Sequence, residues 1–358
     1  MIVRDAYFSE IYELTKLGED IVIVSADLGA PSLDLFRRDF PQRFISVGIA
    51  EQNLLSVAAG IALAGKKVIA FGLNPFPVTR AFDQMRNLLN NLQIPITVAA
   101  LNSGSCSAEC GYTHMPIEDF AMVRTLPHVC MVNPSDEIIA KEAAKKLLGK
   151  KPVFLRFDKN ISGYRYDEEI INFSRGFVTI GLESELSIIT SGNIRASVEN
   201  ILPKLKMLGI DVKLIDAYAF PFDKKEFIDE IKNSRYILTI EDNVLSGGLG
   251  SLVLEILSDN HLNIPIKRLG LSFGNNLSEC FINRDLWYEK LGFNEKQLCE
   301  TIRKSYLELN KYDNNKKKCR KSLQLLLKMN LLLFKYVIIQ RFIDFYSDYR
   351  YSFRIMKS

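Results

Sequence analysis

The acid Glu51 lies where a short β-rich run gives way to a predicted helix of small residues. The run Phe44–Val47 leads through a glycine to this acid, and helical spacing covers Gln52–Ala64 in the sequence GIAEQNLLSVAAGIALA. A carboxyl group held at such a junction can act as a general acid or base. A helix N-terminus also favours a solvated glutamate without a chemical role, so this motif alone leaves both interpretations open.

Two further runs place chemically versatile residues downstream. In PFPVTRAFDQMR, Phe76 follows the predicted strand Lys67–Phe71 and stands four residues before Arg80. In CGYTHMPIEDFAMVRTLPHVCMVNPSD, Cys110 precedes His114 by four residues. An imidazole can bond substrate hydroxyls or relay protons, and the alternative for His114 is a satisfied structural histidine. An ordinary buried aromatic is the alternative for Phe76.

Together the three runs resemble the transketolase family of thiamine diphosphate enzymes. They match the family patterns G-x-x-E-Q, R-A-[FY]-D-Q and D-G-x-T-H-x-x-x-E-D…R-x-x-P-N with few mismatches. The resemblance spans roughly Ile2 to Leu309 and implies that thiamine diphosphate is the cofactor. In such enzymes an acid drives the aminopyrimidine to its imino form, and the cofactor then performs the carbanion chemistry.

The resemblance assigns roles residue by residue. It implies that Glu51 is the cofactor-activating acid, that Phe76 stacks on the aminopyrimidine and that Arg80 lines the same pocket. Asp27, in SADLG, matches a cofactor-side turn, and His114 matches the substrate-facing histidine. The expected catalytic residues are therefore Glu51 and His114, with Asp27, Phe76 and Arg80 binding the cofactor.

The acceptor side departs from the family pattern. Cys110 replaces the aspartate of D-G-x-T-H with a weak hydrogen-bonding group, and Asn102 lies in LNSG, where the family carries T-H-A-G. Arg156, in FLRFDKN, falls on the arginine that grips a sugar phosphate, with a surface ion pair as the alternative. We expect Asn102, Cys110 and Arg156 to bind substrate. We hypothesise that ketol transfer is kept and that the acceptor is a deoxy, keto or nucleotide-linked sugar.

The diphosphate half of the cofactor site is missing from the sequence. Transketolases hold Mg²⁺ and the diphosphate with a G-D-G…N motif, and no G-D-G occurs in this chain. The resemblance therefore implies that this chain is the C-terminal subunit of a split transketolase. An N-terminal subunit carrying G-D-G…N would ligate Mg²⁺. We expect the lone chain to be inactive and the pair to form a heterotetramer or a larger assembly.

Short apolar strands alternate with helices along most of the chain. This pattern predicts an α/β protein with two doubly wound domains and mostly parallel sheets. We place a pyrimidine-binding domain at 1–160, a linker at 161–185 and a smaller transketolase C-terminal-like domain at 186–310.

The predicted site residues share one place in this pattern. Asp27, Glu51, Phe76 and Asn102 each follow directly on a predicted strand. Because ligands collect at the carboxyl ends of parallel strands, these residues should lie at one edge of the first sheet.

A glycine run in the second domain, within Glu241–Gly250, resembles the run of transketolases in which a glutamate precedes G-G-x-G. Glycines that open a helix can cradle an anion. We favour the alternative, in which they permit close packing of strand and helix at a subunit contact.

Composition excludes several classes of protein. The 358 residues are 47% hydrophobic and 25% charged, as in an average soluble globular protein, and the net charge of +4 is too small to imply nucleic-acid binding. The six cysteines include no C-x-x-C pair, and no signal peptide is visible, so we expect a cytoplasmic protein. Cys106, Cys110 and His114 are spaced by four, but zinc sites use tighter pairs and four ligands, so we predict no metal site.

The tail, 311–358, differs from the rest of the chain. It carries 12 Lys or Arg against 3 Asp, a charge of +9, which leaves −5 on the preceding residues. Lys328 and Lys335 interrupt its apolar run, which disfavours a membrane-spanning helix. Three interpretations are open: peripheral contact with an anionic membrane, docking to a partner, and an extension without a role.

Two other functions compete with the transketolase assignment. The β subunit of a 2-oxoacid dehydrogenase shares G-x-x-E-Q and A-F-D-Q, although its later motif is usually of an H-S-Q type rather than THMPIED. In a non-catalytic paralogue, Cys110 and Asn102 would mark decay of the site. The intact Glu51 and Phe76 argue against that second alternative.

Overall fold

The computed structural model describes residues 2–159, 166–181, 183–271 and 281–308, together with residues 324–329, 331, 335, 338, 339 and 341 of the tail. The chain forms two compact units, Met1–Arg303 and Lys304–Ser358. Both predicted domains lie in the first unit. Cys280, Cys319 and most of the predicted tail lie outside the described residues, and the four described cysteines are free thiols.

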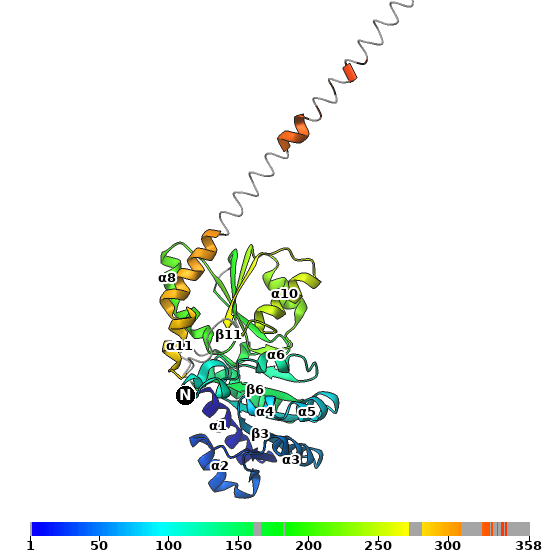
Figure 1. Cartoon of the computed structure of the whole chain (residues 1–358). Helices are drawn as coiled ribbons and strands as arrows, with labels where there is room; N and C mark the ends of the chain where they lie inside the picture. The colour runs from blue at the N-terminus through cyan, green and yellow to red at the C-terminus, as the bar shows by residue number, and fades with distance from the viewer. Residues whose placement is uncertain are drawn as a thin grey trace, which may run out of the picture. The chain divides into compact units, whose positions relative to one another are not determined.

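A seven-stranded sheet forms the centre of the first domain (Figure 1). All neighbouring strands are parallel except at one edge, where β10 runs antiparallel to β5. The order across the sheet is β10 (Ala219–Phe220), β5 (Cys130–Val132), β6 (Val153–Phe157), β4 (Ile96–Leu101), β3 (Lys67–Leu73), β1 (Ile21–Ser25) and β2 (Phe44–Ser46).

Helices cover both faces of this sheet because its strands are apolar on both sides. Along β1, Val22 and Val24 belong to one buried cluster, whereas Ile21 and Ile23 belong to another. The second cluster packs against α1 (Val3–Lys16), α2 (Asp34–Asp39) and α7 (Glu137–Leu147). The first packs against α3 (Glu51–Leu63) and α6 (Asp119–Val123). This is the doubly wound arrangement predicted from the βα alternation.

The helical spacing of Thr79–Leu92 predicts a single helix, and this prediction is wrong in detail. The segment forms α4 (Phe76–Thr79), α5 (Phe82–Gln84) and a π-type helix (Met85–Asn91) in succession. Its first turn begins at Phe76, three residues earlier than predicted, and follows the cis peptide bond Asn74–Pro75. The break places Phe76 and Arg80 beside each other on one short turn.

A second, five-stranded sheet forms the second domain. Its order is β12 (Ile266–Leu271), β11 (Tyr236–Val244), β8 (Leu186–Thr190), β9 (Lys213–Ala217) and β7 (Phe177–Ile180), with only β7 antiparallel to its neighbour. The stretch 161–185 was predicted as a linker, but β7 lies within it and pairs with β9. The helices of the second domain are α8 (Ile194–Met207), α9 (Lys224–Ile231), α10 (Leu249–Asp259) and α11 (Arg284–Leu291). Figure 1 shows α8 and α10 on opposite sides of the five-stranded sheet.

The two domains share one hydrophobic core. The buried cluster that packs under α3 continues through Phe220 and Phe222 to Phe227 of α9 and Val253 of α10. Phe120 and Phe220 meet edge to face, with ring centroids 4.9 Å apart. Residues 219–220 come from the second half of the chain, yet they complete the first sheet as β10.

In the second unit, the described residues 324–329 are helical. The side chains of Leu325, Leu326 and Leu327 are each more than half exposed. Among the described residues, every helix is too short or too polar to cross a membrane.

Candidate active site

Glu51 is the first residue of α3 and follows the carboxyl end of β2. The chain turns at Gly48, whose φ of 70° suits glycine, before the helix begins. The Glu51 side chain is 4% exposed and lies at the positive end of the α3 dipole. Arg80 Nη1 lies 3.3 Å and 3.2 Å from the two carboxyl oxygens. The result is a buried acid paired with a cation whose side chain is 50% exposed.

Arg80 also covers the ring of Phe76. The guanidinium carbon of Arg80 lies 3.9 Å from the centroid of the ring, which is a close cation–π contact. The ring of His114 meets Phe76 edge to face, with centroids 5.4 Å apart and planes at 86°. The structure therefore brings four predicted residues, Glu51, Phe76, Arg80 and His114, into one group, which we call the Glu51 cluster.

His114 keeps one ring nitrogen available. Its Nδ1 lies 2.9 Å from the hydroxyl of Thr113. No hydrogen bond to Nε2 is formed within the part of the chain that the structure describes. An imidazole oriented through one nitrogen can exchange a proton or a hydrogen bond through the other.

The predicted acceptor residues Asn102 and Cys110 bracket a short 3₁₀ segment, Gly104–Cys110, after β4. Asn102 has a φ of 69°, and its amide donates to Ser107 Oγ at 2.7 Å and accepts from Cys106 Sγ at 3.6 Å. Its side chain therefore shapes its own loop. Cys110 is exposed, and the thiol of Cys106 is buried.

A shared metal ion is not supported by this loop. Burial raises the pKa of the Cys106 thiol to about 12, so the group is neutral near pH 7. Within the described ranges no three His, Cys, Asp or Glu side chains come together as a metal site.

Asp27 lies at the carboxyl end of β1, beside β3 in the sheet. It is exposed and has a φ of 54°, the left-handed conformation that aspartate tolerates in turns. Its carboxylate accepts no hydrogen bond from the described residues. The structure places Asp27 at the predicted location, the carboxyl ends of the parallel strands. Asp27 takes no part in the contacts that join the Glu51 cluster.

Arg156 is buried rather than on the surface, with a side chain only 2% exposed. Its Nε and Nη2 each donate to Asp119 at 2.8 Å, and Nη2 also donates to Asn243 at 2.7 Å. Asp119 is fully buried and accepts a further hydrogen bond, at 2.6 Å, from the amide of Asn74. The surface ion pair considered from the sequence is therefore wrong.

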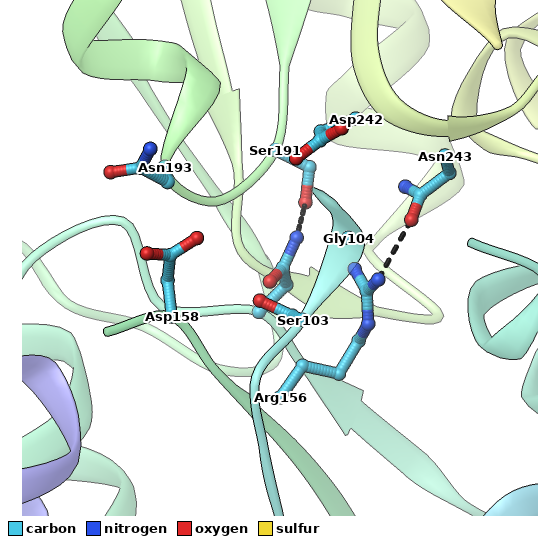
Figure 2. Close-up of a pocket in the computed structure, with 9 residues that line it drawn as sticks. Ser103, Gly104, Arg156, Asp158, Ser191, Asn193, Asp242 and Asn243 are labelled. Carbon is cyan, nitrogen blue, oxygen red and sulfur yellow. Dashed lines mark hydrogen bonds between the residues drawn. The ribbon is translucent and has the colours of Figure 1, made fainter. Parts of the chain in front are cut away.

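A polar crevice between the two domains adjoins this network (Figure 2). Its cavity volume of about 10 Å³ has room for roughly one water molecule. A phosphate group does not fit in this conformation. The crevice is lined by Ser103, Gly104, Asn133, Arg156, Asp158, Ser191, Asn193, Asp242 and Asn243.

Three residues of this network, Asn74, Asp119 and Asn243, were not singled out from the sequence. Asp119 is the final residue of THMPIED, so the motif carried a signal that could have identified it. Asn74 and Asn243 lie outside the three runs, and only the tertiary structure brings them to Asp119 and Arg156.

The glycine run of the second domain contains its own anion. Glu241, which is fully buried, accepts the backbone N–H groups of Leu249 at 2.7 Å and Gly250 at 2.8 Å. A Cβ on Gly248 would lie 2.1 Å from a carboxyl oxygen of Glu241, so glycine is required there. The carboxylate of Glu241 thus fills the N-terminus of α10, which supports close packing over binding of an external anion.

Family comparisons agree with this geometry. The "Transketolase, pyrimidine binding domain" family matches residues 1–163, and the "Transketolase, C-terminal domain" family matches residues 179–277. A putative transketolase C-terminal section from Methanocaldococcus jannaschii is 31% identical over 274 residues, covering 75% of this chain and 86% of that protein.

Two further relatives have more specific names. A protein from Phocaeicola vulgatus, named as one subunit of apulose-4-phosphate transketolase, is 28% identical, and the match covers 83% of this chain and 95% of that protein. A 1-deoxy-D-xylulose-5-phosphate synthase from Shouchella clausii is also 28% identical, but only 45% of its length is covered.

A solved structure has the same architecture. The chain named "Split gene transketolase, inactive beta4 tetramer" is similar with a TM-score of 0.75 and 27% identity. The alignment covers 85% of this chain and 98% of that one. The present chain therefore belongs to the transketolase family and consists of its pyrimidine-binding and C-terminal domains, followed by a basic tail.

Proposed function

We propose that this chain is the C-terminal subunit of a two-chain transketolase, which transfers a two-carbon ketol unit to an aldehyde acceptor. Membership of the family implies use of thiamine diphosphate. The observation that supports the proposal most directly is the Glu51 cluster, in which Arg80 links a buried carboxyl to the ring of Phe76 and that ring contacts the imidazole of His114. Relatives named as one subunit of apulose-4-phosphate transketolase support a two-chain enzyme.

The residues of the Glu51 cluster fit the pyrimidine half of the cofactor. Glu51 is buried at a helix N-terminus, so its carboxyl can hold or release a proton without competing water. Phe76 presents a half-buried ring for stacking, although Arg80 covers it in this structure. Arg80 is half exposed and can move aside at small cost.

Three residues of the Glu51 cluster then have defined tasks. When bound, thiamine diphosphate supplies the carbanion chemistry. Glu51 exchanges one proton through a carboxyl oxygen, and Phe76 fixes the plane of the pyrimidine. His114 Nε2 bonds a substrate hydroxyl or moves its proton, with Thr113 holding Nδ1. We also assign Asp27 to the cofactor side, because it lies at the same sheet edge.

The partner subunit would complete the site. The chain contains no G-D-G sequence, so we propose that an N-terminal subunit with G-D-G…N ligates Mg²⁺ and the diphosphate. Two copies of this chain that bind each other and two copies of the partner would form a heterotetramer. Further association would give a larger assembly. The similar solved structure is a β4 tetramer of a split transketolase and is named as inactive. We expect the present chain to be inactive as well when its partner is absent.

The acceptor is proposed to be an unusual sugar. Asn102 is committed to Ser107 and Cys106, and Cys110 offers only a weak hydrogen bond where an aspartate would hold a hydroxyl. Arg156 has only Nη1 free of hydrogen bonds to described residues, and the adjoining crevice admits a water molecule but not a phosphate. The states of Asn102 and Cys110 favour a deoxy, keto or nucleotide-linked acceptor, and the narrow crevice beside Arg156 disfavours an ordinary aldose phosphate bound there.

The test reconstitutes the chain with an N-terminal transketolase subunit that carries the G-D-G…N motif. Ketol transfer from a ketose to a panel of aldehyde acceptors is measured, and release of CO₂ from 2-oxoacids is followed in parallel. We expect ketol transfer by the pair and none by either chain alone. Glu51→Gln should abolish ketol transfer. The free energy of unfolding of the lone chain, measured in urea, should change by at most about 1 kcal/mol, since Gln keeps the side-chain shape.

Other outcomes would identify the competing functions. Release of CO₂ without ketol transfer would point to a 2-oxoacid dehydrogenase subunit. Binding of the partner without turnover of any donor would indicate a non-catalytic paralogue. A clear preference for ordinary aldose phosphates would overturn the acceptor assignment alone.

A further inference from the structure

Asp119 is a fully buried carboxylate that the proposed chemistry does not use. It lies at the start of α6, and its two oxygens accept hydrogen bonds from Arg156 Nε and Nη2, from Asn74 Nδ2 and from the backbone of Phe120. The three side-chain distances are 2.6 Å to Asn74 and 2.8 Å to each nitrogen of Arg156. Every donor comes from a group that is itself buried.

These donors belong to segments that carry the proposed site. Asn74 is fully buried, and it lies two positions before Phe76 along the loop after β3. The backbone N–H of Asn74 bonds the carbonyl of Leu101, which directly precedes Asn102. Arg156 lies at the end of β6 and extends the network to Asn243 of β11. Through Asn74 and Arg156, Asp119 therefore connects the carboxyl ends of β3, β4 and β6 in the first sheet with Asn243 in the second domain.

We propose that Asp119 is a positioning residue that holds the Phe76 loop and Arg156 in the geometry the reaction needs. The proposal rests on the function proposed above for the Glu51 cluster. A bidentate carboxylate fixes both the plane and the direction of a guanidinium. The same carboxylate anchors Asn74, so the ring of Phe76 and the guanidinium of Arg156 are set by one group. Asp119 touches neither Phe76 nor the Glu51 carboxyl through a hydrogen bond, and it acts through Asn74 and Arg156.

The isosteric variant Asp119→Asn tests this role. An asparagine has one acceptor oxygen, whereas the aspartate serves three side-chain donors. In either orientation its NH₂ group faces a donor of Arg156, and in one of the two orientations it also faces the amide of Asn74. The charge of Arg156 would also be left buried without its carboxylate. We expect the loop of Asn74 and Phe76 to loosen while the fold is retained.

The first measurement uses the lone chain and needs no cofactor. Hydrogen–deuterium exchange of the peptide covering residues 72–82 should be about tenfold faster in Asp119→Asn than in the wild type. Asp158→Asn is the matched control. Asp158 is likewise buried and receives a bidentate hydrogen bond from Arg284, at 2.9 Å and 2.7 Å, but it makes no bond to Asn74. The control should leave exchange of this peptide unchanged.

The second measurement uses a double variant in which the residues at positions 74 and 119 are swapped. In the double variant Asn74→Asp/Asp119→Asn, the amide nitrogen of residue 119 donates to residue 74, its oxygen keeps the bond from Arg156 Nη2, and the buried cluster regains its negative charge. We expect exchange of the 72–82 peptide to return to within about twofold of the wild type. If Asp119→Asn acted only by lowering overall stability, swapping the residues at positions 74 and 119 would not restore the wild-type rate of hydrogen–deuterium exchange.

The third measurement uses the reconstituted pair. Asp119→Asn should weaken thiamine diphosphate binding, followed by near-ultraviolet circular dichroism, by about tenfold, and the double variant should recover it. Equal effects of Asp158→Asn, or a folded double variant without recovery, would overturn the role of Asp119. If the wild-type pair performs no ketol transfer, the proposed function fails, whereas the exchange result in the lone chain still decides whether Asp119 positions the Phe76 loop.

Discussion

At the scale of single residues, Arg80 decides what the resting Glu51 cluster can do. It pairs with the Glu51 carboxyl and covers the face of Phe76 at the same time. Because half of its side chain is exposed, water screens both contacts, and each contributes at most about 1 kcal/mol. A flat ligand that bonds Glu51 and stacks on Phe76 can therefore displace Arg80.

Cys110 provides a residue-scale prediction about the acceptor. Replacing Cys110 with Asp introduces a strong acceptor for a hydroxyl group where the thiol is weak. In the reconstituted pair, we expect kcat/KM for ordinary aldose phosphates to rise about tenfold relative to deoxy or keto acceptors. Cys110→Ser is the matched control, since it adds a hydroxyl without a charge. An unchanged ratio of the two kcat/KM values in Cys110→Asp would contradict a role in selecting the acceptor.

Single residues differ in how far the sequence could predict them. Glu51, Phe76 and Arg80 could be placed together because each stands at a fixed distance from a strand end in a short motif. Arg156 could not be placed, because its burial depends on Asp119 and on Asn243 from the other domain. A hydrogen-bond network of this kind leaves no periodic pattern in the sequence.

At the scale of elements, the start of α10 is stabilised by a buried acid of the preceding strand. Burial raises the pKa of Glu241 to about 7, although the N–H groups of Gly250 and Leu249 act in the opposite direction. A folded-state pKa above the usual 4.5 means that the folded protein binds this proton more tightly than the unfolded chain. The stabilisation is complete below pH 4.5 and is lost as the pH rises through 7.

Urea unfolding across this pH window tests the assignment. Between pH 5 and pH 8, we expect the unfolding free energy of the wild-type chain to fall by about 3 kcal/mol more than that of Glu241→Gln. Glu255→Gln, on the exposed side of the same helix, should follow the wild-type curve. Parallel curves for wild type and Glu241→Gln would show that Glu241 does not titrate in this range.

Elements also show where sequence patterns stop being informative. The long apolar strands and most helices could be predicted, because their periodicity extends over several residues. β10 contains only two residues, Ala219 and Phe220, and pairs with a strand far away in the sequence. β7 lies beyond a stretch without pattern, so it was included in the predicted linker. Both misassigned strands are short antiparallel edges of otherwise parallel sheets.

At the scale of the whole molecule, the unit Met1–Arg303 contains both sheets and every candidate site residue. Removal of 311–358 deletes a charge of +9. We expect the truncated chain to retain ketol transfer with its partner within about twofold, because no site residue is removed. Activity and complex formation are measured with the full-length chain as control.

The same truncation separates the three interpretations of the tail. Sedimentation with anionic vesicles, lost on truncation and absent with neutral vesicles, would indicate contact with a membrane surface. Weaker complex formation with the N-terminal subunit would indicate a docking segment and contradict the expected retention of activity. Unchanged behaviour in both assays would indicate an extension without a role.

The strand β10 has a consequence for any attempt to divide this protein. Residues 219–220 hydrogen-bond to β5 of the first sheet, although they lie within the second domain of the sequence. A cut between the domains would remove β10, one of the two neighbours of β5, and open a backbone edge on which foreign strands could add. We therefore expect the pyrimidine-binding half to be prone to aggregation as a separate fragment, and we expect a break in the chain to be tolerated better outside these two domains than between them.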